Sequence, residues 1–130
     1  MIKRDLILLV EDDDTDAFIA RTLLLRQHPG LNIQRLNHGL EAQKYLDELD
    51  DIPALIILDL NMPFLNGREF LKGLRSQPTG DECEVVVLSS SENKEDVRQC
   101  KELGVEHYFI KPLTLDMANK IIMLSGSTAT

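Results

Sequence analysis

Several short apolar runs in the chain are followed by residues that could do chemistry. The residues at these positions are acids, a hydroxyl and an ammonium: Glu11, Asp12, Asp59, Ser89 and Lys111. If the runs are parallel strands, their carboxyl ends meet at one edge of a sheet, and these side chains converge there. Carboxylates forced together repel one another, which raises the pKa of some of them. A bound divalent cation relieves that repulsion, so the pattern predicts a cation site.

The expected cation is Mg²⁺, because it prefers oxygen ligands, takes one or two protein carboxylates and keeps several waters. Asp12 and Asp59 are the expected carboxylate ligands. The backbone carbonyl near Asn61 could be a third ligand, and Glu11 could act through a water.

The same residue types suit a phosphoryl group, whose equatorial oxygens share negative charge and need fixed cations and donors. Lys111 would neutralise one oxygen, Ser89 would donate to another, and the cation would bind the third. Asp59 would then be the nucleophile that forms an acyl phosphate.

The elements that must position these residues are five apolar runs with helical patterns between them. Three runs are continuous, Leu6–Val10, Leu55–Leu58 and Val85–Leu88. Continuous runs are typical of strands covered on both faces, as in a parallel sheet. Leu31–Leu36 is more polar and is expected at an edge of the sheet, and Tyr108–Ile110 is the fifth run.

Apolar residues recur at helical spacing between these runs. They form five sets: Ala17, Ala20 and Leu24; Ala42, Tyr45, Leu46 and Leu49; Gly67, Phe70, Leu71 and Leu74; Val97 and Cys100; Ala118, Ile121 and Ile122. Thr114 is expected to cap the last helix, while Pro29-Gly30 and Gly104 are expected to end two others. Alternating strands and helices predict an α/β fold with helices on both faces of a parallel sheet.

Composition narrows the class of protein. The 130 residues are 43% hydrophobic and 28% charged, which is ordinary for one globular domain. The longest apolar runs have five residues, whereas a membrane span needs about 20. The formal net charge of −8 argues against direct nucleic-acid binding. We expect a cytoplasmic protein in which Cys83 and Cys100 are free thiols.

Four motifs in chain order resemble the receiver domain of two-component response regulators. They are V-E-D-D at 10–13, L-D-L-N-M-P at 58–63 with Gly67 beyond, L-S-S at 88–90 and Y-F-I-K-P at 108–112. The resemblance covers about residues 4–124. It implies a doubly wound, flavodoxin-like fold with strand order 2-1-3-4-5 and five helices. It also implies a single receiver domain over 1–130, with a flexible tail at 125–130.

The resemblance implies a role for each residue of the acidic site. Asp59 matches the phosphorylated aspartate of the family. Glu11 and Asp12 match the acidic pair that organises Mg²⁺, and Asn61 matches the residue whose backbone carbonyl binds the cation.

The resemblance also implies the residues that read the phosphoryl group. Lys111 matches the lysine that pairs with the phosphate, and its peptide bond to Pro112 is cis in the family. Ser89 matches the hydroxyl residue that turns toward the phosphoryl group, and Tyr108 matches the switch aromatic. The sequence departs from the family at three places. Serine replaces the commoner threonine at 89, Ser90 stands where a small residue such as alanine is usual, and acids occupy positions 13, 14 and 16.

The function implied is a phosphorylation-dependent switch. A sensor histidine kinase or a histidine phosphotransfer protein would supply the phosphoryl group. The receiver would catalyse only its own phosphoryl transfer and autodephosphorylation, and is otherwise not an enzyme. Output would pass through a separate, unidentified effector protein, with the receiver a monomer or weak homodimer and no attached output domain.

Other interpretations remain open at this point. Asp14 and Asp16 are explained by a helix start, and Glu92, Lys94, Glu95, Asp96 and Arg98 by a solvated helix face. A phosphohydrolase of the haloacid-dehalogenase type would place its nucleophile after the first strand and carry a cap insertion. A flavin-binding module would need a phosphate loop where this chain has acids. A receiver that only binds proteins would not form an acyl phosphate.

Overall fold

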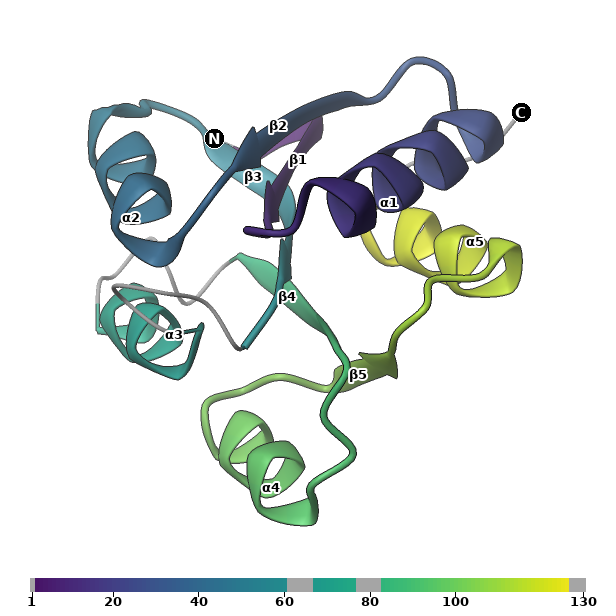
Figure 1. The fold of residues 1–130 in the computed structure, drawn as a ribbon. Coiled ribbons are helices and arrows are strands. Elements are labelled where there is room, and N and C mark those ends of the chain that lie inside the picture. The colour runs from purple at the N-terminus through teal and green to yellow at the C-terminus, as the bar shows by residue number, and fades with distance from the viewer. Residues whose placement is uncertain (1, 61–66, 77–82, 127–130) are drawn as a thin grey trace.

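The computed structural model describes residues 2–60, 67–76 and 83–126 of the chain. Its elements follow in alternating order (Figure 1): β1 (Ile2–Val10), α1 (Asp14–Gln27), β2 (Asn32–Leu36), α2 (Gly39–Glu48), β3 (Ile52–Leu58), α3 (Gly67–Arg75), β4 (Glu84–Ser89), α4 (Lys94–Glu102), β5 (His107–Ile110) and α5 (Leu115–Leu124). All pairings in the sheet are parallel, and the strand order is β2-β1-β3-β4-β5. The expected fold class, strand order and edge position of β2 are confirmed.

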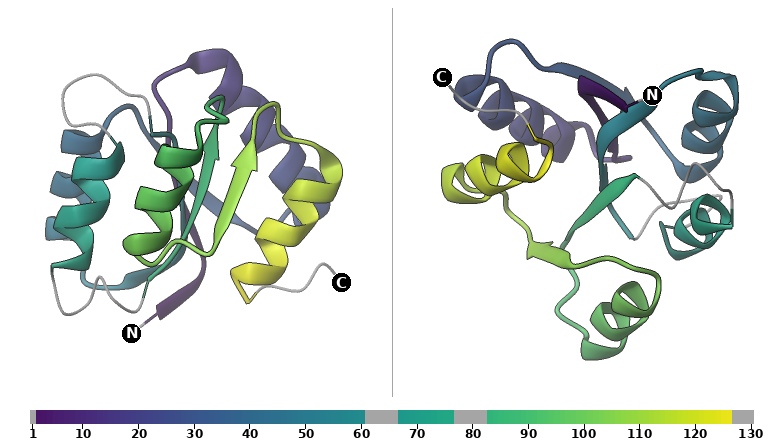
Figure 2. Two further views of the ribbon diagram at one scale, coloured as in Figure 1. Left: turned by 90° about the horizontal axis from the view of Figure 1, so that it is seen from below. Right: turned by 180° about the vertical axis from the view of Figure 1, so that it is seen from behind.

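Helices cover both faces of the sheet (Figures 1 and 2), with α1 and α5 on one face and α2, α3 and α4 on the other. Successive strand residues point to opposite faces. Leu8 and Ile56 pack into the core under α2, α3 and α4, while Ile7 and Leu55 pack into the core under α1 and α5. This two-sided burial explains why the strands are continuous apolar runs.

Two strands extend beyond the runs that predict them. β1 begins at Ile2 and β3 at Ile52, because these segments pair with each other before a register shift between Lys3 and Ile7. Backbone pairing does not require apolar side chains, so hydrophobicity alone underestimates the length of these strands.

The expected helix boundaries are confirmed where a local signal exists. Thr114 caps α5 by accepting from the backbone N–H of Met117. Gly104 follows α4 with a φ of +86°, a conformation that favours glycine. Ser125 is the C-cap of α5 and is buried, so ordered structure extends into the first residue of the expected tail.

Some expectations fall on positions that the structure does not describe. Asn61 and residues 127–130 lie outside the described residues. Within the described ranges, no helix is both long and apolar enough to span a bilayer.

Candidate functional site

Asp59 directly follows β3, the central strand of the sheet. Its backbone N–H donates a hydrogen bond of 3.1 Å to the carbonyl of Val10 at the end of β1. The residue is only 7% exposed. Two neighbouring strands therefore fix the backbone of this acid at the carboxyl edge of the sheet, where parallel α/β folds bind ligands.

Lys111 lies across from Asp59, one residue beyond β5. Its backbone N–H donates to the carbonyl of Ser89, which ties the end of β5 to the end of β4. Its ammonium lies 2.6 Å from Glu11 Oε1, 2.8 Å from Asp16 Oδ2 and 3.3 Å from Asp59 Oδ2. Among the described residues, one cation thus joins carboxylates from the end of β1, from α1 and from the end of β3. The Lys111–Pro112 peptide bond is cis.

The acidic cluster contains Glu11, Asp12 and Asp59, each of which offers a carboxylate oxygen within 4.8 Å of the others. Together with Asp16 and Lys111, the cluster has four carboxylates and one ammonium, which gives a formal charge of −3 when all are ionised. An all-oxygen donor set with excess negative charge suits a hard divalent cation such as Mg²⁺. The donor set therefore fits the metal that the sequence predicts.

The pKa of Glu11 is shifted by burial and by the charged groups around it. Burial raises the pKa of Glu11 to about 7, and the nearby charge of Asp59 adds to the shift while Lys111 opposes it. Burial by itself lowers the pKa of Lys111, but hydrogen bonds from its ammonium to Asp16 and Glu11, together with the charge of Asp59, raise it above its usual range. Lys111 therefore stays charged, while burial first and the charge of Asp59 second favour the protonated form of Glu11.

Asp16 is the site residue that sequence reasoning missed. An acid in the first turn of a helix has a sufficient local explanation, since the helix N-terminus favours negative charge. In the structure it instead forms an ion pair with Lys111, 95 residues away in sequence. The available signal was its place two residues into α1, at the helix end that faces the carboxyl edge of the sheet.

Arg35 of β2 supports the β1–α1 loop from the other side. Its Nε donates 3.1 Å to the carbonyl of Glu11, and its Nη1 lies 2.7 Å from Asp14 Oδ1. Asp14 thus has a structural partner in addition to the favourable position at the helix start.

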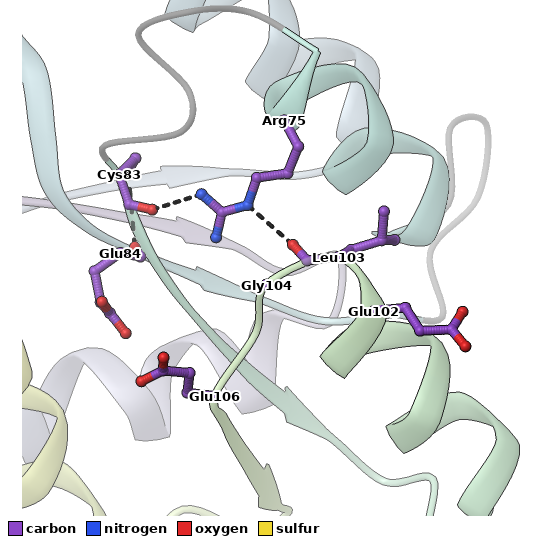
Figure 3. Close-up of a pocket in the computed structure, with 7 residues that line it drawn as sticks. All are labelled: Arg75, Cys83, Glu84, Glu102, Leu103, Gly104 and Glu106. Atoms are coloured by element: carbon purple, nitrogen blue, oxygen red, sulfur yellow. Dashed lines mark hydrogen bonds between the residues drawn. The ribbon is translucent and has the colours of Figure 1, made fainter.

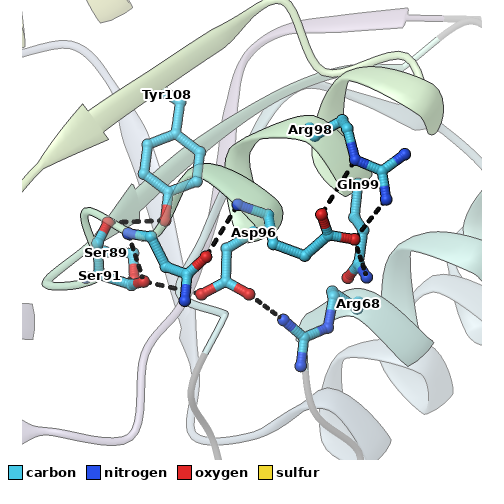
Figure 4. A network of polar contacts seen from close by, with 9 residues as sticks. Arg68, Ser89, Ser91, Asp96, Arg98, Gln99 and Tyr108 are labelled. Carbon is cyan, nitrogen blue, oxygen red and sulfur yellow. Dashed lines mark hydrogen bonds and ion pairs between the residues drawn. The ribbon is translucent and has the colours of Figure 1, made fainter.

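Ser89, Ser91 and Tyr108 form a hydrogen-bonded set beside the acidic site (Figure 4). Ser89 is fully buried and its Oγ accepts 3.2 Å from the backbone N–H of Ser91. The hydroxyl of Tyr108 donates 2.9 Å to the carbonyl of the same Ser91. The peptide groups of one residue thereby connect the serine at the end of β4 with the aromatic ring on β5.

Asp96 belongs to this network and corrects the expectation of a fully solvated α4 face. One of its carboxylate oxygens accepts 2.7 Å from Ser91 Oγ, and the other forms an ion pair with Arg68 of α3 (Figure 4). The exposed pairs of Arg98 with Glu95 and Glu102 agree with the expectation of a solvated face. Asp96 differs because its place on α4 turns it toward α3 and the β4–α4 loop.

A cavity of about 530 Å³ lies at the end of the sheet where the strands begin, opposite to the acidic site (Figure 3). Arg75 of α3 reaches into it and donates to the carbonyls of Cys83 and Leu103. The cavity lies beside the beginning of β4, whereas Asp59 follows the end of β3, so this cavity is separate from the acidic site. The buried Cys83 has a free thiol, as does Cys100.

The fold, together with the acidic site at the carboxyl ends of the strands, defines a receiver domain. Residues 7–123 match the response regulator receiver domain, and the chain belongs to this family. The expected family membership is confirmed, and the family places the protein in two-component signalling systems.

Individual relatives are single-domain regulators of similar size. Response regulator Rcp1 of Synechocystis sp. is 34% identical over 121 residues, which span 89% of this chain and 82% of that protein. The phosphorylated cyanobacterial phytochrome response regulator RcpA superposes with a TM-score of 0.78 at 32% identity, over 94% of this chain and 89% of the other. The Mn²⁺-bound form of Rcp1 superposes with a TM-score of 0.78 at 34% identity, over 94% of this chain and 90% of that chain.

Proposed function

We propose that this protein is the phospho-acceptor of a two-component phosphorelay, in which Asp59 receives a phosphoryl group in the presence of Mg²⁺. The donor would be a sensor histidine kinase or a histidine phosphotransfer protein. The phosphorylated form would switch a protein-binding face for a separate effector. Response regulators typically act in the cytoplasm, and we assign this protein there by family.

The observation that carries the proposal is the carboxylate of Asp59, which lies 3.3 Å from the ammonium of Lys111 and within 4.8 Å of Glu11 and Asp12. A nucleophilic carboxylate needs a nearby positive charge to receive a phosphoryl group that brings further negative charge. The related regulators RcpA, in its phosphorylated form, and Rcp1, in its Mn²⁺-bound form, support the same use of this site.

The transfer itself is a displacement at phosphorus. An oxygen of Asp59 forms the new O–P bond while the N–P bond of a phosphohistidine breaks, and the departing imidazole nitrogen takes the electron pair and a proton. Lys111 would pair with one phosphoryl oxygen, and Ser89 would donate its hydroxyl to another. Glu11, Asp12 and Asp59 would bind the Mg²⁺, which neutralises charge as the phosphoryl group arrives. Attack of water on phosphorus later releases inorganic phosphate and restores the carboxylate.

The switch would begin at Ser89. If its hydroxyl turns to the phosphoryl group, Ser89 Oγ no longer accepts from the backbone N–H of Ser91. The carbonyl of Ser91 accepts the hydrogen bond from the hydroxyl of Tyr108. A shift of the Ser91 backbone would therefore change the position of the Tyr108 ring. We expect the response to appear on the face formed by α4, β5 and α5, since the network lies between α4 and β5.

Incubation with acetyl phosphate and Mg²⁺ tests the proposal. The protein should gain the mass of one phosphoryl group, and Asp59→Asn should abolish the gain. Asp116→Asn is the matched control, because Asp116 is an exposed acid in the first turn of α5 and should leave the gain intact. Mapping of the label to a residue other than Asp59, or no label on the folded wild-type protein, would contradict the assignment.

A further inference from the structure

The three carboxylates that contact the ammonium of Lys111 are not equivalent. Glu11 and Asp59 also belong to the cluster that fits a divalent cation. Asp16, 2.8 Å from the ammonium, lies outside that cluster on α1, and its side chain is 39% exposed. Among the described residues, Asp16 is thus the one carboxylate partner of Lys111 that lies outside the cluster able to hold a cation.

This difference matters when a cation binds. The cation and the ammonium then compete for the oxygens of Glu11 and Asp59, and the two positive charges repel each other. Lys111 is 13% exposed, so water cannot fully replace the contacts that it loses. A partner outside the cluster would keep the ammonium in place while the other contacts weaken.

Asp16 is well placed for this role because its backbone is fixed. Its N–H donates 2.8 Å to the side chain of Asp13, the N-cap of α1. The ion pair between Asp14 and Arg35 of β2 anchors the same turn to the sheet. The carboxylate of Asp16 therefore faces Lys111 from a turn that is held at both its cap and its first residue.

We propose that Asp16 is a positioning residue that keeps the ammonium of Lys111 beside Asp59 when a divalent cation occupies the acidic cluster. The inference rests on the proposed use of the site for a cation, but it does not require that Asp59 be phosphorylated. It makes Asp16 a determinant of how easily the cation and the lysine share the site.

A double-mutant cycle on the full chain, titrated with Mg²⁺ or Mn²⁺ alone, tests the coupling. Asp16→Asn should weaken cation binding about three- to tenfold more in the wild-type background than in a Lys111→Met background. The reason is that without Asp16 the ammonium relies on Glu11 and Asp59 and competes more strongly for them. Asp116→Asn is the control, because it removes one exposed acid from the first turn of α5 and leaves both Lys111 and the first turn of α1 unchanged. It should have an equal, smaller effect in both backgrounds.

An equal loss for Asp16→Asn in both backgrounds would overturn the inference, since Asp16 would then act as a simple negative charge or as a ligand of the cation. The comparison is made on variants whose thermal unfolding and circular dichroism show a folded chain.

A spectroscopic measurement on Lys111 avoids the need for the Lys111→Met variant. The ammonium protons of a buried, ion-paired lysine exchange slowly enough to give a ¹⁵N-edited NMR signal. The Lys111 signal should persist in the wild type when Mg²⁺ is added, should be lost on Mg²⁺ addition in Asp16→Asn, and should be recovered in Asp16→Glu. Persistence of the signal in Mg²⁺-loaded Asp16→Asn would refute the role of Asp16.

These outcomes are separate from the fate of the proposed function. If acetyl phosphate fails to label Asp59 while the cycle shows coupling, the phosphorelay proposal falls and the positioning role stands. If labelling succeeds and the cycle shows no coupling, only the positioning role falls.

Discussion

Replacing Gly67 by alanine should displace Asp59 although the two residues are eight positions apart. The N–H of Gly67 donates 3.0 Å to the carbonyl of Leu60, which brings the start of α3 against the end of β3. A Cβ at position 67 would lie 2.6 Å from the carbonyl oxygen of Asp59 and 2.6 Å from Cα of Leu60. Both atoms belong to the backbone, so no side-chain rotation relieves the contact.

The expected cost follows from this geometry. Overpacking of a buried site typically costs about 1–3 kcal/mol, and here the backbone that must move is that of Asp59. Gly67→Ala should therefore lower the free energy of unfolding by about that amount and also weaken the binding of Mg²⁺.

Gly73→Ala is the matched control on the same helix. A Cβ at Gly73 meets Nε2 of Gln43 at 3.6 Å, an ordinary van der Waals contact. Because glycine in a helix interior is about 0.5–1 kcal/mol less favourable than alanine, this variant should be as stable as the wild type or more stable. Urea unfolding at equal slope compares the two variants, and Mg²⁺ titration should show a loss for position 67 alone.

The refuting result is simple. If Gly67→Ala unfolds at the same urea concentration as Gly73→Ala and binds Mg²⁺ equally well, then the close approach of α3 to the backbone of Asp59 does not exist in solution.

Three further predictions concern the site and the helix that follows it. Burial raises the pKa of Glu11 from 4.5 to about 7, so the folded protein keeps a proton that the unfolded chain releases between these values. The unfolding free energy of the cation-free protein should therefore fall as pH rises through this window, by up to about 3 kcal/mol, and Glu11→Gln should remove this fall in urea unfolding. An identical pH profile for the variant would contradict the shift. Asp12→Ala should weaken Mg²⁺ binding at least about tenfold in a spectroscopic titration, because it removes an exposed carboxylate of the acidic cluster without disturbing the core; an unchanged titration counts against the site. Thr114→Ala should lower stability by about 1 kcal/mol, because Met117 loses the acceptor for its N–H; equal thermal midpoints would show that the cap contributes nothing.

Much of the site was predictable because parallel sheets have a simple rule for where chemistry occurs. Residues that follow parallel strands meet where the carboxyl ends of the strands lie, and this rule alone predicts that Asp59, Glu11 and Lys111 come together. The strand order cannot be predicted from the pattern of hydrophobicity, and its prediction depends on the resemblance to a family.

The contacts that sequence could not predict are those in which a residue has two sufficient explanations. Asp16 is explained by the helix start and Asp96 by a solvated face, so neither position required a distant partner. Their partners, Lys111 and Arg68, lie 95 and 28 residues away. Only the folded chain, which brings Asp16 of α1 beside Lys111 and Asp96 of α4 beside Arg68 of α3, decides between the explanations.

The strand order also determines how many neighbouring strands hold each strand of the sheet in place. β3, which leads to Asp59, is bonded to a strand on each side, whereas β5, which carries Tyr108 and leads to Lys111, closes the described sheet with β4 as its single neighbour. Asp59 therefore follows a strand that is paired on both sides, whereas Tyr108 and Lys111 depend on an edge strand that pairs with β4 alone, so these two residues can shift without breaking the pairing at the centre of the described sheet.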